Sequence, residues 1–411
     1  MEDESLLLHF LENHFHKGIL ILTSDEVCNL LLLYIIIAVA FIDTFSQLPI
    51  ISPFSISLGA SPLLVGVIIG MYSFSNIIGN VFSGIWTDRV GPKQVLCIGM
   101  FTVGTVVFLY SIVENPYQLL LVRFLHGIGG GLIVPAAFTL LGTQNERQTK
   151  GKTMSFSGAS VGIAAITGPA MGAIITERLG FDWLFYIVAF VMIVFGFIAV
   201  FLTNGKRAEQ KEKVTEPQNN NYPTKAVTSW VTSPLMGAYV SIFLLLFTLG
   251  ILTYSLPLKI EDLHMNARTT GILLSVFGAV AIFFFLLPTN KVFDKYKKSS
   301  LMQMGLMIIS IALVLLTISL TLPSLFIAMA VYGIGFALLF PSTSATVIEF
   351  SKERKRGKAF GLFYACFSLG VVTGSMFAGF FAFMSSYVFV LGALTLLLVV
   401  FLKSWLPKVL H

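Results

Sequence analysis

Long apolar stretches alternate with short polar segments along almost the whole chain. Each stretch is about 20 residues or longer, the length that an α-helix needs to cross a hydrocarbon core of about 30 Å. Because a bilayer offers no partners to backbone N–H and C=O groups, such stretches are expected to be helices. We predict twelve transmembrane helices, at residues 29–56, 62–86, 95–113, 116–141, 152–176, 183–203, 235–257, 268–290, 300–321, 324–348, 358–384 and 386–405.

Polar segments divide these spans into two groups. Residues 1–28 are rich in acidic residues, the wrong charge for a signal peptide, and we expect a cytoplasmic N-terminal tail. Residues 204–231 are basic and contain an Asn-rich run that cannot bury a core, so we expect a cytoplasmic linker. The linker separates an N-terminal six-helix half, 29–203, from a C-terminal six-helix half, 232–405. A short cytoplasmic tail, 406–411, follows.

The basic residues lie mostly on one side of this map. With the N-terminus inside, cytoplasmic segments hold all but four of the 26 Lys and Arg residues, the exceptions being Arg123, Arg178, Lys259 and Arg268. An excess of Lys and Arg in short cytoplasmic loops is typical of membrane proteins. We therefore expect a multi-pass cell-membrane protein with both termini in the cytoplasm. The same placement explains the net charge of +6 without a nucleic-acid partner.

Composition narrows the function classes. Apolar residues make up 56% of the chain and charged residues 11%, whereas soluble domains carry about 25% charged residues. The three cysteines lie far apart and form no metal or disulfide pattern, and no nucleotide-binding loop is present. We expect no enzyme activity, no cofactor and no metal. The expected partners are the lipid bilayer and a small-molecule substrate, and we expect a monomer.

The two halves share landmarks at a constant offset of 206 residues. The matching pairs include Asp88 and Asp294, Gly127 and Gly333, Pro135 and Pro341, Gly151 and Gly357, and Gly168 and Gly374. Six spans in each half give the halves the same orientation, so an axis along the membrane normal relates them. Parallel repeats of this kind bind substrate near mid-membrane, between the halves, and work by alternating access.

The loop after the second predicted span carries a specific motif. Residues 84–93 read G-I-W-T-D-R-V-G-P-K. This resembles the G-x-x-x-D-R-x-G-R-K signature of the major facilitator superfamily, with Pro92 as the one departure. The resemblance is strongest to the 12-span drug:proton antiporters, and it implies an all-α major facilitator fold with twelve transmembrane helices in two six-helix halves.

In that family the loop latches the two halves together in the outward-facing state. The resemblance therefore implies a gating role for the motif residues, which are Gly84, Asp88, Arg89, Gly91 and Lys93. Gly84 would allow close helix approach, and Asp88 could sit at the positive N-terminus of a facing helix. A plain positive-inside loop would explain the cations but not Asp88 between two glycines.

Two formal charges lie deep within the predicted spans, Asp43 in the first and Arg123 in the fourth. Charges at such depth are costly and usually face a cavity or a partner. Residues 121–127 resemble the family's fourth-helix signature, whose arginine is tied to proton coupling. We expect protons to be a partner of the protein, with Asp43 as the carboxylate that binds and releases them. Arg123 would adjust the proton affinity of Asp43, since burial disfavours the carboxylate and a nearby cation favours it. A static buried ion pair is the alternative, and His126 could either join a relay or simply be packed or hydrogen-bonded.

The fifth span is rich in small residues around Gly168, Pro169 and Gly172. The segment 164–173 resembles the antiporter signature G-x-x-x-G-P-x-x-G-G, with alanine at both outer positions. In the family this signature marks exporters that exchange substrate for protons. The alternative is a bent, closely packed helix, because proline removes a backbone donor and small residues allow tight packing.

Aromatic residues on the spans expected to line the centre provide a candidate substrate cavity. Its residues are Phe45, Gln47, Phe243, Phe247, Tyr332 and Phe336. An apolar cavity suits large hydrophobic or amphipathic ligands, although any one phenylalanine can equally serve helix packing. The sequence therefore predicts a secondary active transporter that exports small hydrophobic or amphipathic compounds, including drugs, in exchange for protons. A dedicated exporter of an endogenous metabolite or siderophore, a proton symporter and a lipid flippase remain alternatives.

Overall fold

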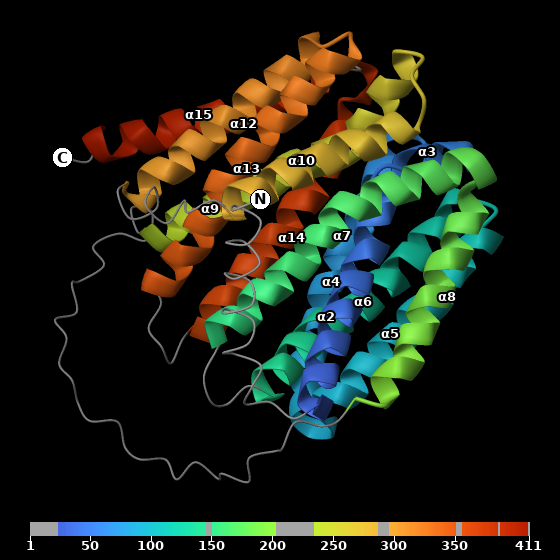
Figure 1. Ribbon diagram of the computed structural model, residues 1–411. Helices are drawn as coiled ribbons and strands as arrows, with labels where there is room; N and C mark the ends of the chain where they lie inside the picture. The colour runs from blue at the N-terminus through green and yellow to red at the C-terminus, as the bar shows by residue number, and fades with distance from the viewer. Residues whose placement is uncertain are drawn as a thin grey trace, which may run out of the picture.

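The computed structural model describes residues 24–144, 150–202, 234–286, 296–350, 356–384 and 387–409. Within these ranges the chain is all-helical (Figure 1). The long helices of the first half are α2 (Ser24–Gln47), α4 (Pro62–Val90), α5 (Pro92–Leu109), α6 (Pro116–Gln144), α7 (Lys150–Leu179) and α8 (Phe181–Val200). Those of the second half are α9 (Pro234–Asp262), α10 (Arg268–Leu286), α12 (Lys298–Ile318), α13 (Leu322–Phe350), α14 (Arg356–Phe380) and α15 (Tyr387–Val409).

Each predicted span overlaps one of these long helices, and the predicted all-helical fold is confirmed. Ten of the described helices are long and apolar enough to cross a membrane, while α10 and α15 contribute the shorter apolar stretches Arg268–Phe284 and Tyr387–Phe401. The predicted linker, 204–231, and most of the predicted tail, 1–28, lie outside the described residues. α2 begins within that tail, at Ser24.

Prolines and glycines set the helix boundaries. Proline stands at the first position of α4, α5, α6 and α9, where a missing N–H breaks no helical hydrogen bond. Gly91 and Gly180 have φ values of 97° and 95°, a region that side chains disfavour. These two glycines therefore let α4 reverse into α5, and α7 into α8, with a single connecting residue.

Two predicted spans had the wrong bounds. The first, 29–56, is two helices, because α2 ends at Gln47 and the short α3 (Ile51–Ser57) follows a turn that contains Pro49. Proline lacks the N–H that the helical ladder needs at this point. The seventh span, predicted to end at 257, continues through Pro257 to Asp262. The longer helix brings Lys259, which is 3% exposed, into the helical bundle as a third buried formal charge.

The helix contacts repeat from one half to the other. In the first half α2 packs on α7, α4 on α6, and α5 on both α6 and α8. The second half repeats this pattern, with α9 on α14, α10 on α13, and α12 on both α13 and α15. Between the halves, α4 packs on α14 and α7 on α10, two contacts that exchange with one another under the repeat (Figure 1).

The bundle has two ends. We call the end that carries α3 and the α9–α10 connection the α3 end, and the opposite end, where α8 stops and α9 starts, the linker end. At the α3 end the halves bond directly, since Ser375 Oγ donates to the Gly66 carbonyl (2.9 Å) and Tyr254 Oη donates to the Pro62 carbonyl (3.1 Å). Toward the linker end, by contrast, Gly84 of α4 and Gly361 of α14 have open space beside them. The described hydrogen bonds between α4 and the other half therefore lie at the α3 end, and neither glycine is in close contact with another helix.

Candidate functional site

A buried polar network connects α2 with α6 inside the first half. Its members on α2 are Asp43 and Gln47, which are 2% and 3% exposed, and those on α6 are Arg123 and His126, which are 7% and 0% exposed. Buried polar groups are stable only when they are hydrogen-bonded. The network satisfies this requirement almost entirely from its own members and nearby backbone.

Both oxygens of the Asp43 carboxyl group have partners. Gln47 Nε2 donates to Oδ1 at 2.9 Å, and His126 Nε2 lies 2.9 Å from Oδ2. Among the described residues no group of three or more potential metal ligands is present.

Arg123 is held by three oxygen atoms. Its Nε and Nη2 donate to the carbonyls of Ile68 and Ile69 on α4, each at 3.3 Å, and its Nη1 donates to Gln47 Oε1 at 3.1 Å. The guanidinium carbon also lies 5.0 Å from the ring centre of Tyr72, within the range of a cation–π contact. Arg123 thus joins α4, α6 and α2.

His126 stands between an acid and a phenol. Its Nδ1 lies 2.9 Å from the hydroxyl oxygen of Tyr110, in the 3₁₀ turn η1 (Tyr110–Ile112) that follows α5. The Tyr72 ring meets the imidazole edge-on, with ring centres 4.9 Å apart. Close packing of α4 on α6 makes this arrangement possible, because a Cβ at Gly127 would collide with Tyr72 and Ser75.

The network contains both residues predicted from the sequence, Asp43 and Arg123, but they do not contact one another. We expected Asp43 and Arg123 to approach one another, whereas in the structure Gln47 stands between them and Asp43 contacts His126 instead. His126 is therefore hydrogen-bonded on both nitrogens rather than merely packed. Sequence reasoning missed Tyr72 and Tyr110, since one tyrosine within an apolar span gives no signal of its own.

The glycines of the fifth-span motif pack α7 against α2. A Cβ at Gly168 would lie 2.8 Å from Phe45 Cβ, and one at Gly172 would collide with the Ser46 backbone. On its other side α7 meets the second half, because a Cβ at Gly271 of α10 would collide with the Pro169 carbonyl. α7 is therefore fitted between the helix that carries Asp43 and the opposing half.

The gating-motif residues lie at the linker end, around the turn from α4 to α5. Asp88 and Arg89 are exposed, and Gly91 supplies the positive φ of the turn. Asp88 has no hydrogen bond or ion pair to another residue that the structure describes. The close helix approach expected at Gly84 is absent here, because nothing lies within 4 Å of a Cβ at that position. Lys93 is partly buried at the start of α5.

The six residues predicted to line a substrate cavity are found in helix contacts. Phe243 stacks on Phe247 of the same helix, and Phe247 meets Phe377 of α14 edge-on at 5.2 Å. Phe336 contacts Phe277 of α10, also at 5.2 Å. Phe45 is partly buried beside Gly168. Gln47 and Tyr332 are almost fully buried, and each is hydrogen-bonded to a neighbouring helix.

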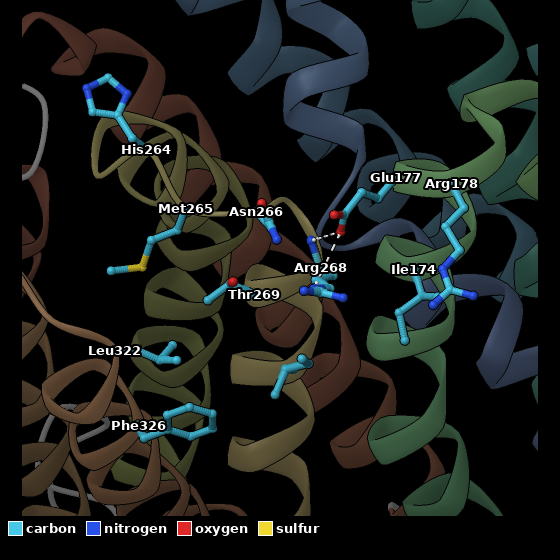
Figure 2. Close-up of a pocket in the computed structure, with 11 residues that line it drawn as sticks. Ile174, Glu177, Arg178, His264, Met265, Asn266, Arg268, Thr269, Leu322 and Phe326 are labelled. Atoms are coloured by element: carbon cyan, nitrogen blue, oxygen red, sulfur yellow. Dashed lines mark hydrogen bonds and ion pairs between the residues drawn. The ribbon is translucent and has the colours of Figure 1, made fainter.

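Two cavities lie at the α3 end, and neither includes any of those six residues. The larger, of about 660 Å³, lies between α7, the start of α10 and the start of α13 (Figure 2). At its rim Glu177 Oε2 accepts a hydrogen bond from the Arg268 backbone N–H (3.1 Å) and lies 4.0 Å from Arg268 Nε. This contact joins the two halves, and its residues were not among the predicted site residues.

Comparisons with known proteins agree with this architecture. The sequence profile of the Major Facilitator Superfamily matches residues 33–287 and 238–410. The chain is 22% identical over 363 residues to the uncharacterized MFS-type transporter MJ1560 of Methanocaldococcus jannaschii, covering 84% of this chain and 90% of the relative. It is 23% identical over 360 residues to the quinolone resistance protein NorA of Staphylococcus aureus, covering 85% and 89%.

Among solved structures, the chain resembles a bacterial homologue of the human lysosomal transporter Spinster in an inward-facing, unoccupied conformation. The TM-score is 0.72 at 15% identity, over 88% of this chain and 84% of that one. At such low identity the likeness supports the fold alone. Together with the profile match, which spans nearly all of the described residues, it leads to one conclusion. The chain belongs to the major facilitator superfamily and is a secondary transporter rather than an enzyme.

Proposed function

We propose that this protein exports small hydrophobic or amphipathic compounds, including drugs, in exchange for protons. The observation that carries the proposal is the buried network around Asp43, His126, Gln47 and Arg123. It contains two groups, a carboxyl and an imidazole, that can bind or release a proton under physiological conditions when their surroundings change. Intramembrane groups of this kind commonly mark proton relays.

The orientation follows from the basic residues. On the map of spans predicted from the sequence, all 26 lysines and arginines except Arg123, Arg178, Lys259 and Arg268 fall on the same side of the membrane as residues 204–231. The positive-inside rule therefore assigns the linker end, and both termini, to the cytoplasm of a cell. The α3 end then faces outside, so the contacts between the halves correspond to a transporter closed to the outside.

α7 is the element through which protonation can reach the interface between the halves. It packs on α2 at Gly168 and Gly172, close to Asp43, and on α10 of the other half at Pro169. Protein interiors are too densely packed for α2 to shift without moving α7. A rearrangement around Asp43 would therefore be passed to the α7–α10 contact, which fits the antiporter role that the motif resemblance implies.

The aromatic side chains of the second half favour an apolar substrate. Phe277, Phe336 and Phe340 form one cluster on α10 and α13, and Phe243, Phe247 and Phe377 form another on α9 and α14. Ligand sites are mostly lined by such apolar groups with few polar ones. The name of the distant relative, a quinolone resistance protein, points to the same substrate class.

The exposed gating loop fits the same conformation. Asp88 and Arg89 are exposed and form no ion pair with another described residue. We propose that the loop engages the other half only when the linker end closes and the α3 end opens. Gly84 would then be the point of close approach that is not used in the present conformation.

The test uses purified protein in liposomes that contain a pH-sensitive dye, with an imposed proton gradient. A panel of lipophilic cationic drugs and siderophores is added to wild type, to Asp43→Asn and to the control Asp182→Asn. Asp182 is an exposed carboxylate in the first turn of α8 and is not one of the four network residues. We expect drugs to trigger proton movement in wild type and in the control, and Asp43→Asn to lose it.

Other outcomes would contradict specific parts of the proposal. Proton movement triggered only by siderophores would replace drug export with export of a dedicated metabolite. Compound transport without proton movement in wild type would indicate a uniporter or flippase. In that case Asp43 and its partners would be structural.

A further inference from the structure

Arg123 determines which way the Gln47 amide points. A guanidinium group can only donate hydrogen bonds, so the Gln47 atom 3.1 Å from Arg123 Nη1 must be the amide oxygen. The amide nitrogen then faces Asp43 Oδ1 at 2.9 Å and donates to it. Oδ1 is consequently fixed as an acceptor and cannot carry a proton while these two hydrogen bonds persist.

The remaining place for a proton is the line through Asp43 Oδ2, the His126 imidazole and the Tyr110 hydroxyl, where both contacts measure 2.9 Å. With a neutral imidazole, Nε2–H donates to Asp43 and the Tyr110 hydroxyl donates to Nδ1. An added proton occupies Nδ1, and both imidazole nitrogens then donate. Tyr110 must turn its O–H away and accept from Nδ1 instead.

We propose that His126, rather than Asp43 alone, binds the exchanged proton, and that the Tyr110 hydroxyl reverses from donor to acceptor when it does. The inference rests on the proposed proton-coupled transport and names the residue that performs it. Asp43, with one oxygen held by Gln47, serves as the fixed counter-ion. No bond other than those to hydrogen is made or broken, and the proton returns to solvent when His126 becomes neutral again.

Protonation of His126 changes the net charge of the buried network. In the neutral-imidazole state the positive charge of Arg123 and the negative charge of Asp43 compensate one another, whereas protonated His126 leaves one buried positive charge in excess. The groups that face His126 are Asp43 from α2, Tyr72 from α4, Tyr110 from η1 and Arg123 on its own helix. Asp43 alone among them is acidic. Because an uncompensated buried charge is strongly unfavourable, protonation favours a conformation that hydrates or separates these groups.

The surroundings of Tyr110 restrict its response to the hydroxyl group. The ring is fully buried and stacks on Phe185 of α8, with ring centres 4.8 Å apart. The imidazole edge of His126 packs on it from another side, at 5.6 Å. The ring therefore stays in place, and rotation about the C–O bond is the movement that changes its role from donor to acceptor.

The first experiment measures drug-triggered proton movement and drug transport separately in liposomes, for wild type, Asp43→Asn and His126→Gln. Glutamine retains hydrogen-bonding groups but cannot hold the added proton. We expect His126→Gln to transport the drug down its own gradient, while its drug-triggered proton movement falls at least about tenfold below that of wild type. His264→Gln, in the exposed α9–α10 connection, is the matched control and should behave as wild type.

A second measurement applies to wild type and does not depend on the folding of a variant. Infrared difference spectra recorded between high and low pH distinguish protonation of an imidazole from protonation of a carboxyl group. We expect imidazole bands that are lost in His126→Gln. A carboxylic-acid carbonyl band that is lost in Asp43→Asn would overturn the assignment.

Tyr110→Phe tests the hydroxyl reversal, with Tyr117→Phe as its control, since Tyr117 is exposed on the same side of the first half. Loss of the acceptor destabilises the imidazolium through a charge-assisted hydrogen bond, so proton movement should shift toward lower pH by about one unit or less. An unchanged pH profile would refute the reversal. Normal proton movement in His126→Gln with loss in Asp43→Asn would refute this inference alone, whereas no proton movement in wild type would refute the proposed function as well.

Discussion

The two halves of the protein solve the same packing problem with different chemistry. His126 of α6 contacts Asp43 of α2, and Tyr332 of α13, which lies 206 residues after His126, bonds to Thr248 of α9. Each contact connects the first and fourth long helices of its half. Arg123, three residues before His126, has Met329 as its counterpart, and Met329 is fully buried. The first half thus holds charges where the second holds neutral groups.

This difference bears on the role of the charged network. A hydroxyl pair is sufficient to join the same helices in the second half, where Tyr332 Oη and Thr248 Oγ1 lie 2.9 Å apart. Buried ion pairs are seldom more stabilising than well-packed neutral side chains. Joining these helices therefore does not require charged groups, and the choice between the coupling role and the static ion pair is a matter for the proton-movement experiment.

The largest effect is expected when the first half is made to resemble the second, by Arg123→Met. Asp43 would be left without a nearby cation, and Gln47 together with two α4 carbonyls would lose a donor. Leaving a buried charge uncompensated typically costs about 3–5 kcal/mol. We expect the midpoint of thermal unfolding in detergent to fall markedly, whereas Met329→Leu, a change that conserves volume, should have a small effect.

A double variant tests the cause of that loss. Adding Asp43→Asn to Arg123→Met removes the stranded charge, so the double variant should be more stable than Arg123→Met alone. If it is less stable, Asp43 is not the charge that Arg123 compensates. The difference in side-chain shape between Arg123 and Met329, rather than the difference in charge, would then explain the loss of stability.

An intermediate effect is expected at the glycines that both halves share. Gly168→Ala would bring a Cβ to 2.8 Å from Phe45 Cβ, and Gly374→Ala would collide with the backbone carbonyl of Phe247. Overpacking of this kind costs about 1–3 kcal/mol, and we expect the larger loss at Gly374 because backbone atoms yield less than side chains. Thermal unfolding measures both. Gly84→Ala, with open space around it, is the control and should stay within about 0.5 kcal/mol.

The smallest effect is expected from Thr248→Val in the second half. The change conserves shape but leaves the fully buried Tyr332 hydroxyl without this partner, a loss of about 1–2 kcal/mol. We expect slightly lower thermal stability and an unaltered number of protons moved per drug molecule in liposomes. A changed proton dependence would show that the second half takes part in coupling, and the contrast between the halves would be weaker than the geometry indicates.

The fold could be read from the sequence almost completely, because lipid imposes helices of a known length on apolar stretches. The errors have identifiable causes. Pro49 signalled the break between α2 and α3, but the apolar run on both sides of it concealed the turn. Pro257, by contrast, did not end α9, since a proline can kink a helix without terminating it.

The site was only partly predictable. Burial of a formal charge identified Asp43 and Arg123 from composition alone. The Asp43–His126 contact joins residues 83 positions apart, and it depends on how two helices are rotated about their axes. Hydrophobic periodicity cannot fix that rotation in spans that are apolar on nearly all sides. The gating loop and the phenylalanine cavity remain predictions for the same reason, because their contacts belong to arrangements of the two halves that no sequence pattern specifies.

The closure at the α3 end has a consequence for the medium in which the protein can work. Its close contacts are largely between backbones, as where Gly66 meets Ser375, Gly379 meets Pro62 and Gly271 meets Pro169. Dissolved salt screens exposed charge pairs such as Glu177 and Arg268, which contribute little in any case, but contacts between neutral backbone groups have no net charge for salt to screen. The closure of the α3 end should therefore depend little on the ionic strength of the solution that it meets.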